Sequence, residues 1–100
     1  MKEECGITEN SLENARELID RLGVPNKVTL NYIKDPWDYI VKAEWDTFTF
    51  EFSGFSWGYG GTAPHGLDLF ITWCVGNNGA DKEIFNLHKE VENYVIFEKF

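Results

Sequence analysis

The sequence predicts an α+β fold: one helix, a three-stranded and mainly antiparallel sheet, and then two helices, with the helices packed on one face. Apolar residues recur at helical spacing near the start of the chain and again after residue 62, whereas residues 27–53 alternate between apolar and polar side chains. The chain has 100 residues, of which 43% are hydrophobic, so we expect a single domain over residues 1–100. Residues 1–7 are expected to form a flexible tail.

The first predicted helix covers residues 10–22. Asn10 is a favoured N-cap residue, and Glu13 three positions later completes a capping box. Gly23 supplies a C-terminal stop and Pro25 prevents continuation. The apolar stripe of this helix is formed by Leu12, Ala15, Leu18, Ile19 and Leu22.

Alternation of apolar and polar residues predicts three strands, at residues 27–34, 39–45 and 47–53. Asp35-Pro36 separates the first two, because proline lacks the backbone donor that a central strand requires. Asp46 lies between the last two, which predicts a tight antiparallel hairpin.

Two further helices are predicted. The first runs from residue 62 or 63 to Val75, with Pro64 in the first turn, where its missing N–H costs little. A turn at residues 76–79 follows, and Asp81 is expected to cap a last helix that ends near Phe97. The residues expected to face inward from this last helix are Ile84, Leu87, Val91, Tyr94 and Val95.

The charge of the chain is strongly negative. Nine basic residues face seventeen acidic ones, which gives −8. Lys and Arg are not clustered in either half of the chain, so direct binding of nucleic acid is not expected. The excess of carboxylates favours a basic protein partner. The candidate acidic surface residues are Asp35, Asp38, Asp46, Glu51 and Asp68.

Cysteine usage and hydropathy predict the compartment. Cys5 and Cys74 form no C-x-x-C pair, and we expect Cys74 to be buried and Cys5 to be exposed. No apolar h-region follows the first residues, and no apolar stretch reaches the ~20 residues that span a bilayer. The expected location is therefore a reducing cytoplasm, with no membrane contact.

The glycine-aromatic loop, residues 56–66, is the most unusual segment of the chain. Three interpretations remain open: a tight reversal whose aromatic rings fill the core, an anion site ahead of a helix N-terminus, or a recognition surface. No lysine lies in the loop, so it lacks a Walker-type phosphate site, and no βαβ frame accompanies the Gly58-x-Gly60 spacing of a dinucleotide fingerprint. The candidate binding residues are Trp57, Gly58, Tyr59, Gly60, Gly61, Thr62 and His65.

The segment Trp57-Gly58-Tyr59-Gly60-Gly61-Thr62-Ala63-Pro64, followed by Leu67 and Leu69, resembles a motif shared by a family of small uncharacterised proteins. That family, with a WGYGG[ST]-x-P motif, occurs in bacteriophages, prophages and other mobile elements. The resemblance covers about residues 52–97. It differs at Ala63, where the family has glycine, and at Asp68 and Phe70, where it favours small apolar residues. The resemblance implies a phage or mobile-element context and assigns no functional residue.

Few other residues suggest chemistry. His65 and Asp68 are three apart, as an oriented general base would need, but no nucleophile motif accompanies them. A capping role for Thr62 and an exposed His65 explain these residues better. His88 and Glu92 are expected to form a surface pair at helical spacing, and turn chemistry explains the Asp35 and Asp38 carboxylates.

These observations predict a non-enzymatic acidic interaction protein of a phage or mobile element. In this hypothesis it inhibits a host nucleic-acid-binding or defence complex, in the manner of an anti-CRISPR protein, by covering its basic surface. No catalytic residue, metal or cofactor is expected, and exposed sheet edges allow a homodimer. The alternative is a small-molecule or anion-binding domain, or an enzyme, that uses the glycine-aromatic loop.

Overall fold

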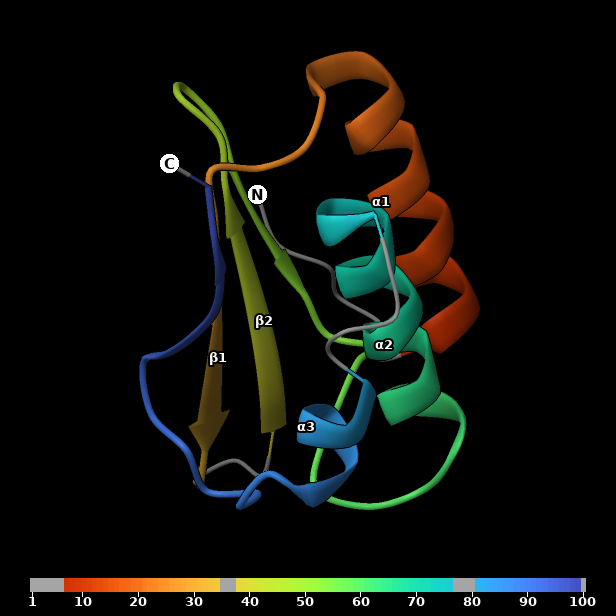
Figure 1. The fold of residues 1–100 in the computed structure, drawn as a ribbon, viewed down its shortest axis with the longest axis vertical. Coiled ribbons are helices and arrows are strands. Elements are labelled where there is room, and N and C mark those ends of the chain that lie inside the picture. Colours follow the sequence, from red (N-terminus) through yellow and green to blue (C-terminus); the bar gives the residue numbers. More distant parts are fainter. Residues whose placement is uncertain (1–6, 35–37, 77–80, 100) are drawn as a thin grey trace.

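The computed structural model describes residues 7–34, 38–76 and 81–99. In chain order its elements are α1 (Thr8–Leu22), β1 (Lys27–Ile33), β2 (Asp38–Glu44), β3 (Thr49–Phe52), α2 (Thr62–Val75), α3 (Asp81–Asn86) and β4 (Tyr94–Glu98). The four strands form one antiparallel sheet in the order β3-β2-β1-β4. The three helices lie on one side of that sheet (Figure 1). The fold class is therefore α+β.

The prediction of a three-stranded sheet followed by two helices was wrong. The last helix ends at Asn86 instead of Phe97, and Tyr94–Glu98 pairs with β1 as a fourth strand. Backbone hydrogen bonds hold this segment in place: Tyr32 N–H donates to the Val91 carbonyl at 2.9 Å, and Lys99 N–H donates to the Asn26 carbonyl at 2.7 Å. Apolar residues at helical spacing misled the prediction, because pairing with β1 satisfies the backbone of this segment in an extended conformation.

The start of α1 also differs from the prediction. Ile7 is the N-cap, in an extended conformation (φ −101°, ψ 122°), and no side chain caps the helix, so Asn10 lies inside it and forms no capping box. The first turn is held from outside instead. Thr8 Oγ1–H donates to the Gly54 carbonyl at 2.7 Å, and Gly54 N–H donates to Ser11 Oγ at 2.9 Å. These two bonds to the end of β3 fix where the helix begins.

The remaining elements agree with the prediction to within two residues. β1, β2 and β3 correspond to the three predicted strands, and α2 runs from Thr62 to Val75. Gly76 ends α2 in a left-handed conformation (φ 80°) and donates its N–H to the Thr72 carbonyl. The rest of the predicted turn at 76–79, Cys5, Asp35 and residues 1–6 of the predicted tail lie outside the described residues.

The pleat of the sheet separates an apolar face from a polar one. Val28, Leu30, Val41, Ala43 and Phe52 are fully buried toward the helices. Side chains alternate along a strand, so the residues between them face the opposite side of the sheet. On that side the described cross-strand neighbours are largely polar and charged, as in Lys27 with Glu44 and Lys42 with Glu51. No helix in the described part of the chain is long and apolar enough to cross a membrane.

Candidate functional site

Trp57 of the glycine-aromatic loop belongs to the core. Its side chain is 0% exposed, and its ring meets that of Tyr39 edge to face with centroids 4.8 Å apart. Its indole Nε1–H donates to the Lys89 carbonyl at 3.1 Å. Gly58 continues this attachment, with φ at +86° and its N–H donating to the Ile84 carbonyl at 2.9 Å. The first half of the loop is thus fastened both to α3 and to the segment that leads from α3 to β4.

The second half of the loop faces solvent. Tyr59 is 47% exposed, and its hydroxyl lies 2.8 Å from the hydroxyl of the buried Ser56. Gly60, Gly61, Thr62 and His65 are exposed. Thr62 does not cap α2 as predicted, because the N-cap is Gly61 and no side chain bonds to the first turn. The candidate residues of this loop therefore divide between core and surface, and a binding role for them stays a prediction.

The two histidines that the sequence pairs with carboxylates lie in different surroundings. His65 is exposed on the first turn of α2, and Asp68 is half-buried one turn later. His88 lies beyond the end of α3, so the predicted helical spacing to Glu92 does not apply there. Its Nδ1 accepts a hydrogen bond from the Glu90 N–H at 3.2 Å. In the described ranges no group of three or more His, Cys, Asp or Glu side chains is placed to hold a metal ion.

The predicted acidic surface residues do not form one patch. Asp38 and Glu51 lie on β2 and β3, Asp46 lies in the turn between these strands, and Asp68 lies on α2 across the core. Asp38 Oδ1 accepts a hydrogen bond from the Tyr39 N–H at 2.9 Å, and Asp46 Oδ1 accepts one from Asn26 Nδ2 at 2.6 Å. These two carboxylates have local structural roles.

A carboxylate stripe on α1 escaped the sequence analysis. We use this name for Glu9, Glu13, Glu17 and Asp20, which are all exposed. Their spacing of four, four and three residues places about one carboxylate on each turn of one helix face. The two arginines of α1 have other partners: Arg21 pairs with Glu17 at 2.8 Å, and the Arg16 guanidinium lies 5.5 Å from the Trp73 ring centroid. This spacing is a signal in the sequence itself, on the polar side of the helix whose apolar stripe predicted it.

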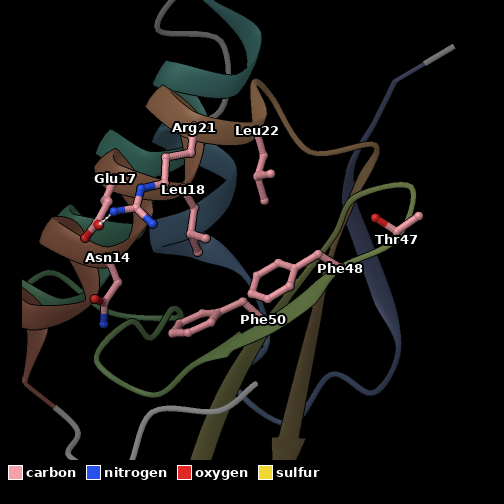
Figure 2. Close-up of a pocket in the computed structure, with 8 residues that line it drawn as sticks. All are labelled: Asn14, Glu17, Leu18, Arg21, Leu22, Thr47, Phe48 and Phe50. Atoms are coloured by element: carbon pink, nitrogen blue, oxygen red, sulfur yellow. Dashed lines mark ion pairs between the residues drawn. The ribbon is translucent and has the colours of Figure 1, made fainter.

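A groove of about 520 Å³ lies between α1 and the edge of the sheet. Figure 2 shows Leu18 and Leu22 on the helix side and Phe48 and Phe50 on the strand side. The polar residues that complete the lining are Asn14, Glu17, Arg21 and Thr47. We call this the α1/β3 groove. Glu17 belongs both to its lining and to the carboxylate stripe.

The α1/β3 groove continues past the β2–β3 turn. A second hollow of about 230 Å³ shares Leu22, Thr47 and Phe48 with it and extends to Asp46 and Lys99. Leu22 stands between the two and is 47% exposed. The apolar surface here is thus accessible along both sides of Leu22, and its polar surroundings carry carboxylates on α1 and at the turn.

Burial shifts the acidity of two groups elsewhere in the molecule. Burial raises the pKa of the Cys74 thiol to about 12. Burial, followed by the proximity of Tyr59 and Tyr32, raises the pKa of Tyr39 above its usual value. Neither group borders the groove, so neither supplies it with a proton donor or acceptor near neutral pH.

Comparison with known proteins gives no match among protein-family models, curated proteins or solved structures. The resemblance of residues 57–64 to a phage and mobile-element family therefore stays a prediction.

Proposed function

We propose that this chain is a non-enzymatic, acidic protein-binding domain of a phage or mobile element that engages the basic surface of a host protein. The host protein is a nucleic-acid-binding or defence component, whose Lys and Arg side chains normally hold phosphates. Occupying that surface with carboxylates would block its access to nucleic acid.

The charge distribution on α1 supports this proposal. The carboxylate stripe presents Glu9, Glu13 and Asp20 to solvent in addition to the ion-paired Glu17. Regularly spaced negative charges on a rigid helix attract a row of cations, and this attraction acts over the ~8 Å Debye length of physiological salt. A helix also keeps the charges in a fixed arrangement, which favours one cationic pattern over another.

The observation that carries the proposal is the contact between this stripe and the α1/β3 groove. Charge alone gives weak association, because exposed ion pairs contribute about 0–1 kcal/mol each. Apolar surface contributes ~25 cal/mol per Å² when it leaves water. Leu22 and Phe48 line the same groove as Glu17, so a partner that meets Glu17 can also bury apolar side chains.

Neutralising the stripe tests the proposal. The variant Glu9→Gln, Glu13→Gln, Asp20→Asn removes three negative charges from α1. The matched control Glu90→Gln, Glu92→Gln, Glu98→Gln removes three from exposed positions between α3 and the end of β4. Wild type, variant and control are immobilised, and bound bacterial proteins are identified by mass spectrometry over a series of salt concentrations.

We expect a basic protein to bind wild type and control, to elute with increasing salt, and to bind the α1 variant at least several-fold more weakly. Equal losses in variant and control would show that net charge alone governs binding. Failure of wild type to retain any basic protein would contradict the proposed function.

A further inference from the structure

We propose that the α1/β3 groove accepts an extended segment of the partner protein, which adds at Glu51 to the edge of β3 that pairs with no other described strand and alternates apolar residues with Lys or Arg. This inference rests on the proposed function and specifies how the partner is held. It combines two observations. β3 lies at an edge of the sheet to which the described residues add no further strand, and an apolar groove lies beside that edge while Glu51 lies on the other face of the sheet.

β3 lies at one edge of the sheet, and its register with β2 is regular through all four residue pairs. Trp45 N–H donates to the Phe48 carbonyl at 2.7 Å. Because hydrogen-bonded and non-hydrogen-bonded pairs alternate in an antiparallel ladder, Phe50 and Phe52 direct their backbone groups toward β2 and Glu51 directs its own away. The Glu51 backbone therefore offers a donor and an acceptor to an added strand.

The opposite edge of the sheet is less suited to strand addition. The ladder between β1 and β4 shifts register between Val28 and Thr29, which marks a bulge. Bulges increase local twist and disrupt pairing, and they protect edge strands in natural sheets. β3 has no bulge, and its main protection is its length of four residues. An added strand therefore forms few hydrogen bonds and needs side-chain contacts as well.

The groove supplies those contacts on one face of the added strand. Phe50 faces the helices, and Leu18 and Leu22 approach from α1 (Figure 2). A volume of about 520 Å³ lies within the ~300–1,000 Å³ range of ordinary binding pockets. Because successive side chains of a strand point to opposite faces, every second residue of the added segment enters this groove and must be apolar.

The other face of the added strand meets negative charge. Glu51 points to the face of the sheet away from the helices, beside Lys42 on β2. The Lys42 Nζ lies 3.4 Å from a Glu44 carboxylate oxygen, so Lys42 pairs with its neighbour on β2. A Lys or Arg beside Glu51 on the added strand forms a favourable cross-strand pair. The intervening residues of the segment are therefore basic.

A second copy of the chain is a poorer occupant of this edge. Pairing of β3 with β3 would bring the Glu51 carboxylates of two copies onto the same face of a joined sheet, where like charges destabilise it. Each copy also carries a net charge of −8. With a basic segment, the contact beside Glu51 and the long-range interaction with the negatively charged chain both become attractive.

The first test uses synthetic peptides and fluorescence anisotropy. The probe alternates lysine and valine, and the control peptide has the same composition with all lysines followed by all valines. We expect the alternating peptide to bind at least ten-fold more tightly than the block peptide. Equal affinities would overturn the proposal, because they would show that charge attracts both peptides without strand addition.

Paired substitutions then locate the site. Leu22→Gln removes apolar surface from the groove, and Val95→Gln makes a matched change at the other sheet edge, where Val95 is 41% exposed. We expect about ten-fold weaker binding for the first and no change for the second. Glu51→Lys is expected to weaken binding several-fold more than Glu98→Lys, which alters net charge equally. The reverse order in either pair would overturn the proposal.

N-methylated peptides test the backbone contact. Methylating the amide nitrogens of all lysines, or of all valines, removes donors that point to one side of an extended peptide. Strand addition predicts that one of these two peptides loses binding and the other retains it: the lysine set is lost for antiparallel addition and the valine set for parallel addition. Loss of neither would indicate docking through side chains alone, and loss of both would show that the contact is not confined to one edge of the peptide; either result would overturn strand addition.

Separate outcomes distinguish this inference from the proposed function. A basic host protein whose binding depends on the carboxylate stripe but not on Leu22 or Glu51 would support the proposed function and overturn strand addition. Dimerisation of the chain that is abolished by Leu22→Gln would assign the groove to a second copy and would also overturn it.

Discussion

The indole Nε1–H of Trp57 donates a hydrogen bond to the Lys89 carbonyl oxygen across 3.1 Å. This bond joins the loop after β3 to the segment between α3 and β4. The two bonded residues are 32 positions apart in the sequence. The same indole ring packs against Tyr39 on β2. One side chain therefore connects the sheet, the loop and the last third of the chain.

Replacing Trp57 should destabilise the whole domain. Trp57→Ala removes a fully buried ring, and we expect the free energy of unfolding to fall by about 3–5 kcal/mol. Trp57→Phe keeps an aromatic ring but leaves the Lys89 carbonyl without this donor, so we expect a smaller loss of about 1–3 kcal/mol. Urea denaturation followed by circular dichroism measures both. Equal stability of wild type and Trp57→Ala would contradict the buried position.

Tyr59 provides the contrasting case within the same loop. Its ring is largely exposed, so Tyr59→Phe should cost only about 1 kcal/mol, mainly through loss of the hydrogen bond to Ser56. The same denaturation experiment applies. A loss as large as that of Trp57→Ala would mean that the Tyr59 hydroxyl is as important to the fold as the Trp57 ring.

Gly54 should tolerate no side chain. A Cβ added there would lie against the Ile7 carbonyl oxygen and 2.5 Å from Ser11 Oγ, at the point where α1 begins. We expect Gly54→Ala to destabilise the domain by about 1–3 kcal/mol through overpacking. Gly60→Ala is the control, because an added Cβ meets nothing within 4 Å there. The two midpoints of thermal unfolding should differ by several degrees, with Gly60→Ala close to wild type.

Cys74 should make stability fall at high pH. Burial keeps its thiol protonated in the folded state up to a pKa of about 12, whereas an unfolded thiol ionises near 8.5. Above that lower value the unfolded state binds fewer protons than the folded state, so stability decreases with rising pH until the folded thiol also ionises. In a Cys5→Ser background, Cys74→Ala should reduce the slope of the unfolding free energy between pH 9 and 11. Parallel slopes would contradict the burial effect.

Asn93 distinguishes the observed fourth strand from a continuous helix. It has φ at +51° immediately before β4. In that conformation Asn93→Gly should leave stability unchanged or raise it slightly, and Asn93→Val should lower it by about 1–2 kcal/mol. Within a helix, glycine would instead cost about 1 kcal/mol relative to alanine. Chemical denaturation of Asn93→Gly, Asn93→Ala and Asn93→Val measures the order of their free energies of unfolding.

Local pattern was sufficient where the neighbouring element is also close in sequence. The strands at 27–33, 38–44 and 49–52 pair with one another through short connections, and α2 follows them with a strong apolar face. Period-2 alternation located the strands, and the glycines after α1 and α2 marked the ends of those helices. Residues close in the sequence largely determine the conformation of these elements.

Distant pairing explains the main error. Residues 91–97 carry apolar side chains at helical spacing, but Tyr94, Val95, Ile96 and Phe97 are also consecutive strand-forming residues. The strand conformation of this segment depends on pairing with β1, which lies some 70 residues earlier in the sequence. No local sequence pattern reveals that pairing. The start of α1 was misplaced for a similar reason, because Thr8 and Ser11 are held by Gly54.

The candidate site was partly visible in the sequence and partly not. The acidic composition pointed to a basic partner, but the residues chosen for the acidic surface lie on three elements. The spacing of Glu9, Glu13 and Glu17 could have been recognised. The groove could not, because it depends on how far Leu22 stands from Phe48 once the helix and the sheet edge have packed.

The pairing of Lys27 with Glu98 has a consequence for synthesis in the cell. At ~5–20 residues per second, the ribosome needs roughly 4–14 seconds to pass from one position to the other. During that interval a nascent β1 has been made but lacks one of its two neighbours. A strand that stays unpaired on one side for seconds can associate with the same strand of another nascent chain. The yield of folded protein should therefore depend on translation speed and on chaperones that shield the nascent chain.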